Sequence, residues 1–309
     1  MNRSKARKSI PTLKMNFSAY RAGKGYTPSS IRVQDSHLRR YTGWCYERGI
    51  TVKKITYDQL LGFIDSERER GIAPGSIAQE VNSIRIYYDY LIKKGQAKKN
   101  LANKIRIRDS GHKVLTETFS VDKLEKIYQD YSNRPDWKHP SARAVLLHKR
   151  NTVVLGFLIF QGFLSGNLAR LEMGHVDLKK STVYIASDRK TNARILSLQA
   201  AQVLTIKTYL EDVRPRLMEY QMEESPLLFV VQKHGEMVRR IIKEVQRQHP
   251  QVTGSRQIRA SVIIAWLKTG NLRQTQYMAG HKSIRTTESF RRGDLTGLVR
   301  QLEFFHPLK

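Results

Sequence analysis

The sequence predicts a mainly α-helical protein with a small β-hairpin, divided into two domains. Apolar residues recur at helical spacing over most of the 309 residues. One pair of short runs rich in β-branched and apolar residues, STVYIA and ARILSL, interrupts this pattern, and the polar segment SDRKTN joins them. A chain of this length can also form two separate hydrophobic cores.

The first domain is predicted to consist of three amphipathic helices separated by glycine-containing turns. Thr27 and Pro28 form a favourable N-cap and first-turn pair for the first of them. Thr56 begins the second helix, and the third is expected at about 75–91. Basic residues cover the outer faces of these helices, so we expect this domain to be solvated or to face a polyanion.

The second domain is expected to be helical around the hairpin. Ser120 is a suitable N-cap for its first helix, and residues 106–118 have no clear period, which is typical of a linker. The other helices are expected at about 142–161, 199–213, 237–248, 256–268, 272–278 and 295–304. We place a basic arm at 1–14, the first domain at 15–108, the linker at 109–119, the second domain at 120–293, and a C-terminal helix and tail at 294–309.

The charge of the chain points to a nucleic-acid partner. Lys and Arg number 55 against 27 Asp and Glu, which gives a formal net charge of +28. A surplus this large is typical of proteins that bind nucleic acid. A solvated basic surface and a membrane surface are the weaker alternatives.

Other sequence features exclude several classes of site. The longest apolar run, VVLGFLIF at 153–160, is far shorter than the roughly 20 residues that span a bilayer, so we expect a buried helix there. Cys45 is the single cysteine, which excludes an intrachain disulfide and a cysteine-built zinc site. The N-terminus lacks the apolar stretch of a signal peptide, so we expect a cytoplasmic, nucleoid-associated protein.

Two arginines in SRQIRASVIIAWLKTG are candidates for binding a phosphate. Arg256 and Arg259 are three residues apart, on one face of a predicted helix. Two guanidinium groups on one face can hold a phosphate through charge-assisted hydrogen bonds. A solvated basic turn is the alternative for an arbitrary arginine pair.

A Gly-His pair follows in QYMAGHKSIRTTESF. Phe290 stands nine residues after His281, in a polar and basic setting. A lone histidine is usually structural and an isolated phenylalanine usually belongs to a core. Their spacing after Arg259 is what favours a functional site.

The segment QIRASVIIAWL followed by QYMAGHKSIRTTESF resembles the C-terminal half of the tyrosine recombinases and phage-type integrases. The resemblance extends over about 17–305 and is specific in the last third. It implies an N-terminal helical, SAM-like core-binding domain and a C-terminal catalytic domain. It also implies that Arg259 is the second catalytic arginine, that His281 is the histidine of the Gly-His box, and that Arg256 stands where most members have His.

The resemblance places three further positions. Phe290 stands at the position of the nucleophilic tyrosine, and the hairpin tip, with Lys190 or Arg189, stands where the family keeps its catalytic lysine; residue type favours Lys190. The first family arginine corresponds to Leu164. Its substitutes could be Arg170, Arg194 or Arg256, of which we prefer Arg256 because it lies on the active-site helix.

The family cleaves and rejoins DNA through a 3′-phosphotyrosyl link without metal, ATP or another cofactor. The resemblance therefore implies a DNA clamp, a short inverted-repeat site and a homo-tetramer assembled on DNA. Because Phe290 has no phenolic oxygen, we expect this chain not to cleave, either as an inactivated recombinase or as a natural DNA-binding or architectural relative. A general RNA-binding basic protein is a third possibility.

Two regions of the chain are expected to make intermolecular contacts. Phosphate contacts in the first domain are expected from Arg32, Arg39, Arg40, Lys93 and Lys94. The C-terminal helix is expected either to pack on its own domain or to dock into a neighbouring protomer.

Overall fold

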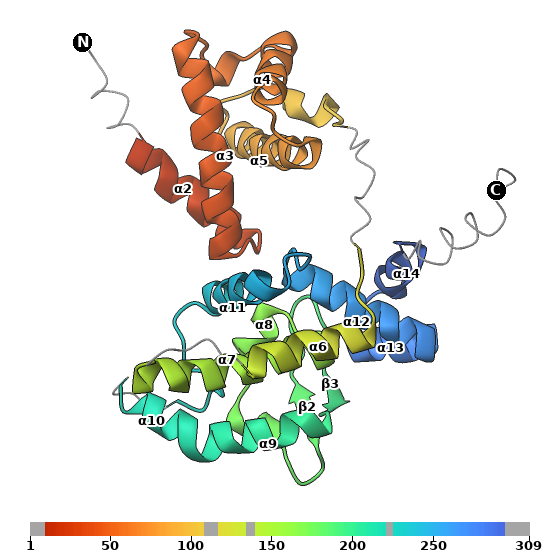
Figure 1. Cartoon of the computed structure of the whole chain (residues 1–309). Coiled ribbons are helices and arrows are strands. Elements are labelled where there is room, and N and C mark those ends of the chain that lie inside the picture. The colour runs from red at the N-terminus through yellow and green to blue at the C-terminus, as the bar shows by residue number, and fades with distance from the viewer. Residues whose placement is uncertain (1–9, 108–116, 134–139, 221–224, 294–309) are drawn as a thin grey trace, which may run out of the picture. The chain divides into compact units, whose positions relative to one another are not determined.

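The chain divides into two compact units, Met1–Val114 and Leu115–Lys309. The computed structural model describes residues 10–107, 117–133, 140–220 and 225–293, with side chains described from residue 16 to residue 291. Described helices dominate both units, and the one sheet found in these ranges is three-stranded (Figure 1). The predicted fold class, mainly α with a small β element, is confirmed.

The first unit consists of four α-helices and two short 3-10 turns in its described part. Thr27 caps α3 by accepting a hydrogen bond from the Ser30 N–H at 3.3 Å, and Thr56 forms a capping box with Gln59 at the start of α4. The predicted helix starts at Thr27 and Thr56 are therefore confirmed. The helices are α2 (Ile10–Gly23), α3 (Pro28–Glu47), α4 (Tyr57–Glu69) and α5 (Pro74–Lys93), with turns at Val52–Lys54 and Leu101–Lys104.

Helix α2 was not predicted. Residues 10–14, which we expected to belong to a basic arm with little to pack, are its first turns. Phe17 is buried, and its ring contacts Tyr87 and Tyr90 at centroid distances of 5.3 and 5.1 Å. The rest of the expected arm, 1–9, lies outside the described residues.

In the second unit, helices surround a short antiparallel sheet. The strand order is β1-β2-β3, and Val183 pairs with Leu196 across the predicted hairpin. The strands are β1 (Val176–Asp177), β2 (Thr182–Ile185) and β3 (Arg194–Ser197). The helices are α6 (Val121–Ser132), α7 (Ala142–Phe160), α8 (Ser165–Leu168), α9 (Ala200–Thr208), α10 (Arg214–Met218), α11 (His234–Gln248), α12 (Ser255–Thr269), α13 (Leu272–Ala279) and α14 (Ile284–Gly293).

Helix α7 is the centre of this unit. Its second half is buried on every side from Thr152 to Ile159, and helices α6, α9 and α12 pack against it. The apolar run at 153–160 is thus a core helix, as predicted. No described helix is long and apolar enough to cross a membrane.

Most predicted helices of the second unit are confirmed, and the structure adds the short helices α8 and α10 as well as α14. The segment Tyr209–Val213 is a π-helical stretch that joins α9 to α10. Helix α14 was not predicted, and it places Phe290 well inside a helix. The predicted helix at 295–304 and most of the predicted linker lie outside the described residues.

Candidate active site

Arg259 joins three segments of the second unit. It lies on α12 with 7% of its surface exposed. Its guanidinium donates to the carbonyl oxygen of Gly162 after α7 and, at 2.8 Å, to that of Ala279 at the end of α13. The conformation of this side chain is therefore fixed by backbone acceptors.

The Gly-His pair ends α13. Gly280 has a φ of +70°, the left-handed conformation that glycine adopts most easily after a helix. The N–H of His281 donates back to the carbonyl of Gln276 at 3.0 Å. The helix end thus turns the His281 side chain towards α12.

His281 is buried between a donor and an acceptor. One nitrogen of Arg259 lies 3.3 Å from Nε2, and Nδ1 lies 2.9 Å from the Thr287 hydroxyl. Because a guanidinium can only donate, Nε2 accepts and Nδ1 carries the proton. Burial, with the charges of Arg259 and Arg194, lowers the pKa of His281 to about 4. The ring is neutral at neutral pH.

The hairpin tip is bonded to this pair. Thr191 pairs with His281 in an isolated β-bridge, and the Asn192 N–H donates to the Gly280 carbonyl at 2.9 Å. Asp188 shapes the tip by accepting from the backbone N–H groups of Lys190 and Thr191. Burial opposes ionisation of Asp188, yet these bonds and that from Arg170 hold its pKa at about 2.

The two candidates for the family lysine lie on this tip. The side chains of Arg189 and Lys190 are both exposed. The backbone anchoring brings the tip beside the Gly-His pair. Which of the two side chains is the proton donor stays a prediction.

Arg194 is one of the substitutes that the sequence analysis named beside the preferred Arg256, and its charge acts on both Arg259 and His281. It lies on β3 with 2% of its surface exposed, and its Nη1 donates to the Asn192 carbonyl at 3.3 Å. Its Nε and Nη2 have no hydrogen-bond partner among the described residues. Burial lowers the pKa of Arg194 to about 10, and its charge contributes to lowering that of Arg259, also to about 10.

The alternation of β3 could have identified Arg194. Within ARILSL, Arg194 and Leu196 share one face of the strand, and both are buried. Leu164, at the position of the first family arginine, is 36% exposed. Arg170 is exposed and ion-paired with Asp188 at 2.5 Å, so its charge is partly compensated.

Arg256, our preferred substitute, lies in the first turn of α12 and is exposed. Its guanidinium makes no hydrogen bond or ion pair within the described ranges. The structure thus brings Arg259, His281 and Arg194 together and leaves Arg256 at the exposed end of the helix.

Phe290 lies directly beside His281. The two rings are stacked, with centroids 5.7 Å apart and an interplanar angle of 10°. Helix α14 holds the phenylalanine there, partly buried. The position that the resemblance gives to the nucleophile is therefore next to the Arg259–His281 pair.

The cluster of Arg194, Arg259 and His281 is positive, and the charge of Asp188 partly compensates Arg194. No carboxylate forms an ion pair with either arginine in the described part of the chain. Such a site favours an anion with several oxygens, such as a phosphate. Within the same part of the chain, no group of three or more His, Cys, Asp or Glu could hold a metal ion.

Comparison with known proteins gives matches along nearly the whole chain. The model of the phage integrase family matches residues 96–294. Tyrosine recombinase XerD of Chlorobaculum tepidum is 23% identical over 303 residues, covering 96% of this chain and 93% of that protein. The TnP I resolvase of Bacillus thuringiensis is 22% identical, covering 88% and 92%.

Solved structures share the fold. The XerH site-specific recombinase bound to palindromic difH substrate aligns with a TM-score of 0.64 and 18% identity, over 89% of this chain and 80% of that one. The predicted resemblance is confirmed: the chain belongs to the phage integrase family of tyrosine recombinases.

Proposed function

We propose that the chain binds double-stranded DNA at a specific site and holds one backbone phosphate at Arg259 and His281. In this proposal it forms no covalent link to DNA, because Phe290 occupies the position of the nucleophile. The observation that carries the proposal is the stacking of the Phe290 ring on His281, next to Arg259. The ring stands at the position that the resemblance gives to the nucleophilic tyrosine, without the phenolic oxygen.

The chemistry gives each residue a role. In the family reaction a phenolic oxygen attacks phosphorus, the 5′ oxygen leaves with a proton, and a 3′-phosphotyrosyl bond forms. Arg259 and His281 would stabilise the charge on the non-bridging oxygens, and Lys190 or Arg189 would donate the proton. Arg194 would add positive charge that Leu164 cannot supply, through its field and not through contact, because it is buried.

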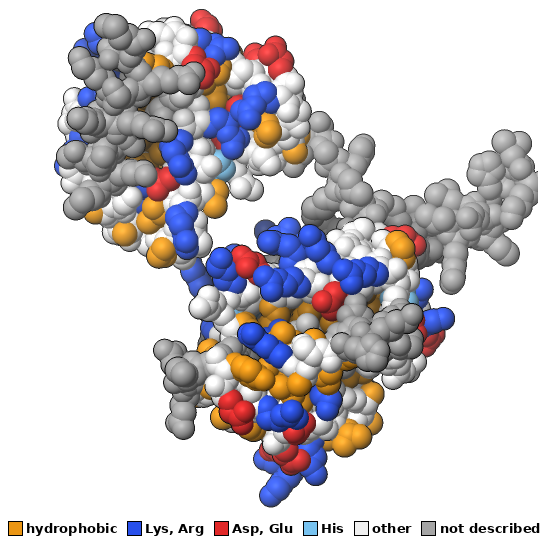
Figure 2. Space-filling model, turned by 60° about the vertical axis from the view of Figure 1, so that its left-hand side comes forward, with side chains coloured by type: hydrophobic (Ala, Val, Ile, Leu, Met, Phe, Trp, Pro, Cys, Tyr) orange, Lys and Arg blue, Asp and Glu red, His pale blue; other side chains and the backbone are white. Residues whose placement is uncertain are grey.

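Basic surfaces support a clamp around DNA. Figure 2 shows Lys and Arg side chains gathered on the visible face of the second unit. On α11, Arg239, Lys243 and Arg247 are exposed at helical spacing on one face. Such a row can contact successive phosphates without reading sequence.

In the first unit, four of the five cations that we expected to contact phosphates are exposed, and the fifth is ion-paired. Arg32, Arg39, Lys93 and Lys94 are exposed. Arg40 is ion-paired with Glu67 and Glu80. We therefore expect Arg40 to stabilise its own unit, and the four exposed cations to face DNA.

The solved relatives support the choice of DNA as the partner. The XerH structure contains palindromic difH DNA after cleavage, and a lambda integrase structure shows a dimer bound to a core site. By analogy we propose an inverted-repeat site bound by two copies, with a tetramer holding two duplexes.

Leu164 favours a second candidate function. A chain that never cleaves has no need of the first family arginine, so a natural DNA-binding or architectural relative would tolerate this residue. In that case the site would hold a phosphate for positioning only.

The DNA-binding part of the proposal is tested by footprinting on DNA that carries candidate inverted repeats. We expect a short protected repeat occupied by two copies, and much weaker protection by Arg259→Gln. Equal affinity for arbitrary RNA and DNA would contradict the proposal and favour a general basic RNA-binding protein.

A further inference from the structure

A basic pocket lies between helices α7 and α11, away from the cluster of Arg194, Arg259 and His281. It encloses about 600 Å³, which is within the range of small-molecule sites. The described side chains that line it include four cations and two carboxylates: Arg143, Arg150, Lys233, Arg240, Glu236 and Glu244. The excess charge of the lining is positive.

Both carboxylates have partners of their own. Glu236 is ion-paired with Lys233 at 3.3 Å, and Glu244 accepts from the Tyr131 hydroxyl at 2.8 Å. Four cations thus face the pocket against two carboxylates, of which Glu244 partly compensates the charge of Arg150.

Arg150 is a partly buried cation of the pocket. Its guanidinium donates twice to the neutral side-chain oxygen of Asn151, at 2.9 and 3.2 Å, and it forms no ion pair with any described carboxylate. Burial lowers the pKa of Arg150, and the charge of Arg240 adds to this, while Tyr209, Tyr131 and Glu244 oppose the shift. A partly buried cation without a carboxylate partner is a costly arrangement unless an anion completes it.

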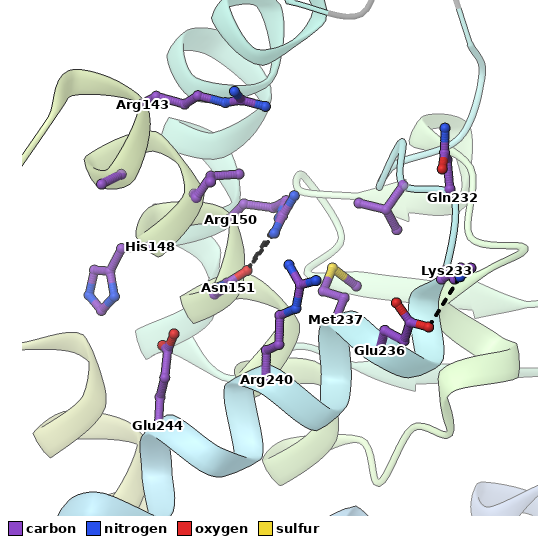
Figure 3. Close-up of a pocket in the computed structure, with 13 residues that line it drawn as sticks. Arg143, His148, Arg150, Asn151, Gln232, Lys233, Glu236, Met237, Arg240 and Glu244 are labelled. Carbon is purple, nitrogen blue, oxygen red and sulfur yellow. Dashed lines mark hydrogen bonds and ion pairs between the residues drawn. The ribbon is translucent and has the colours of Figure 1, made fainter.

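Two arginines from different helices reach the same space. Arg150 extends from α7 and Arg240 from α11, and their guanidinium groups point towards one another in Figure 3. Like charges repel, and an anion between the two groups would relieve this repulsion. Two planar guanidinium groups facing one space match the oxygens of a phosphate.

The beginning of α11 adds to the positive potential. This 15-residue helix starts at His234, and no side chain caps its first N–H groups. Lys233, Glu236 and Met237 from this end line the pocket. The positive end of the helix dipole therefore lies at the pocket.

We infer that the pocket between α7 and α11 is a binding site for a phosphate group, held by Arg150 and Arg240 with Arg143 at its edge. The group belongs either to a free phosphate or pyrophosphate, or to the backbone of bound DNA. This inference does not depend on the proposed function at Arg259 and His281.

Calorimetric titration of the full-length chain with inorganic phosphate and with pyrophosphate, at constant ionic strength set by chloride, tests the inference. We expect saturable binding that Arg240→Gln weakens at least tenfold. Arg239→Gln is the matched control, because it makes the same charge change one residue away on α11 and does not line the pocket. Equal loss in both variants, or no saturable binding by the parent chain, would overturn the inference.

Two more variants separate this site from others. Arg150→Gln should abolish the binding while the melting temperature in phosphate-free buffer stays equal or rises, because an uncompensated charge is removed. Arg259→Gln should leave unchanged the binding that Arg240→Gln weakens, and selective loss of that binding in Arg259→Gln would place the anion at the other cluster and overturn the inference.

Repeating the titration on the DNA complex identifies the source of the phosphate. If a DNA phosphate fills the pocket, bound DNA blocks pyrophosphate, and Arg240→Gln weakens DNA binding. If the ligand is a free anion, pyrophosphate binds the complex as well, and Arg240→Gln weakens pyrophosphate binding while DNA binding changes little. Pyrophosphate binding by a chain that does not bind DNA would contradict the proposed function and leave the inference about the pocket intact.

Discussion

The guanidinium of Arg194 occupies the space where a side chain at Gly280 would begin. A Cβ built on Gly280 would lie 2.9 Å from Cζ of Arg194 and 3.2 Å from the Asn192 carbonyl oxygen. The glycine of the Gly-His pair is thus required by packing as well as by its φ of +70°. It allows β3 and the end of α13 to approach closely.

Gly280→Ala should therefore destabilise the second unit by about 2–4 kcal/mol, from backbone strain together with displacement of Arg194. Gly49→Ala is the control for strain alone, because Gly49 has a φ of +64° and open space around its Cβ. It should cost only about 1 kcal/mol. Urea unfolding measures both, and equal losses would show that the contact with Arg194 is unimportant.

The buried His281 should make stability depend on pH. Its folded pKa of about 4 lies below the ordinary value of 6.5. Between these values the unfolded chain binds a proton that the folded chain does not, so stability falls as pH decreases from 6.5 towards 4. The loss is about 3 kcal/mol at most.

Comparison with His281→Gln isolates this effect from the other titrating groups. The free energy of unfolding, measured with urea at pH 7 and pH 4.5, should fall less in the variant than in the parent chain. An equal fall in both would contradict the assignment of a neutral, buried imidazole.

Arg194→Met should raise the pKa of His281, because the charge of Arg194 is one of the causes that lower it. It should also weaken DNA binding by roughly tenfold or less, since the charge acts through its field. NMR titration of the His281 ring gives the pKa. Arg256→Met is the matched control, and a larger pKa shift in that variant would favour Arg256 as the substitute for the missing arginine.

The sequence was sufficient for the elements with strong local signals. N-caps at Thr27, Thr56 and Ser120 and the alternation around the hairpin each act over a few residues. Helix α14 escaped prediction because its sequence, IRTTESFRRG, is almost entirely polar. Its position depends on contacts with α12 and α13, both of which precede it in the chain. The pattern of its own residues does not show these contacts.

The site was predictable in its spacing but not in its charges. The interval between Arg259, His281 and Phe290 follows from short local geometry, so the sequence pattern places these residues. Arg194 and Arg256 are both arginines near the site in sequence, and only the packing of β3 against Gly280 separates them. Arg194 is buried and Arg256 is exposed, and the burial of a charged residue is the least visible feature of a sequence.

The most direct test of the central claim is incubation of Phe290→Tyr and of the parent chain with a suicide DNA substrate that carries the bound site. We predict a covalent protein–DNA adduct for Phe290→Tyr, because the hydroxyl would be added to a ring already stacked on His281, and none for the parent chain. Adduct formation by the parent chain, or its absence from a Phe290→Tyr variant that binds the same DNA with full affinity, would contradict the claim that the phenolic oxygen is what this site lacks.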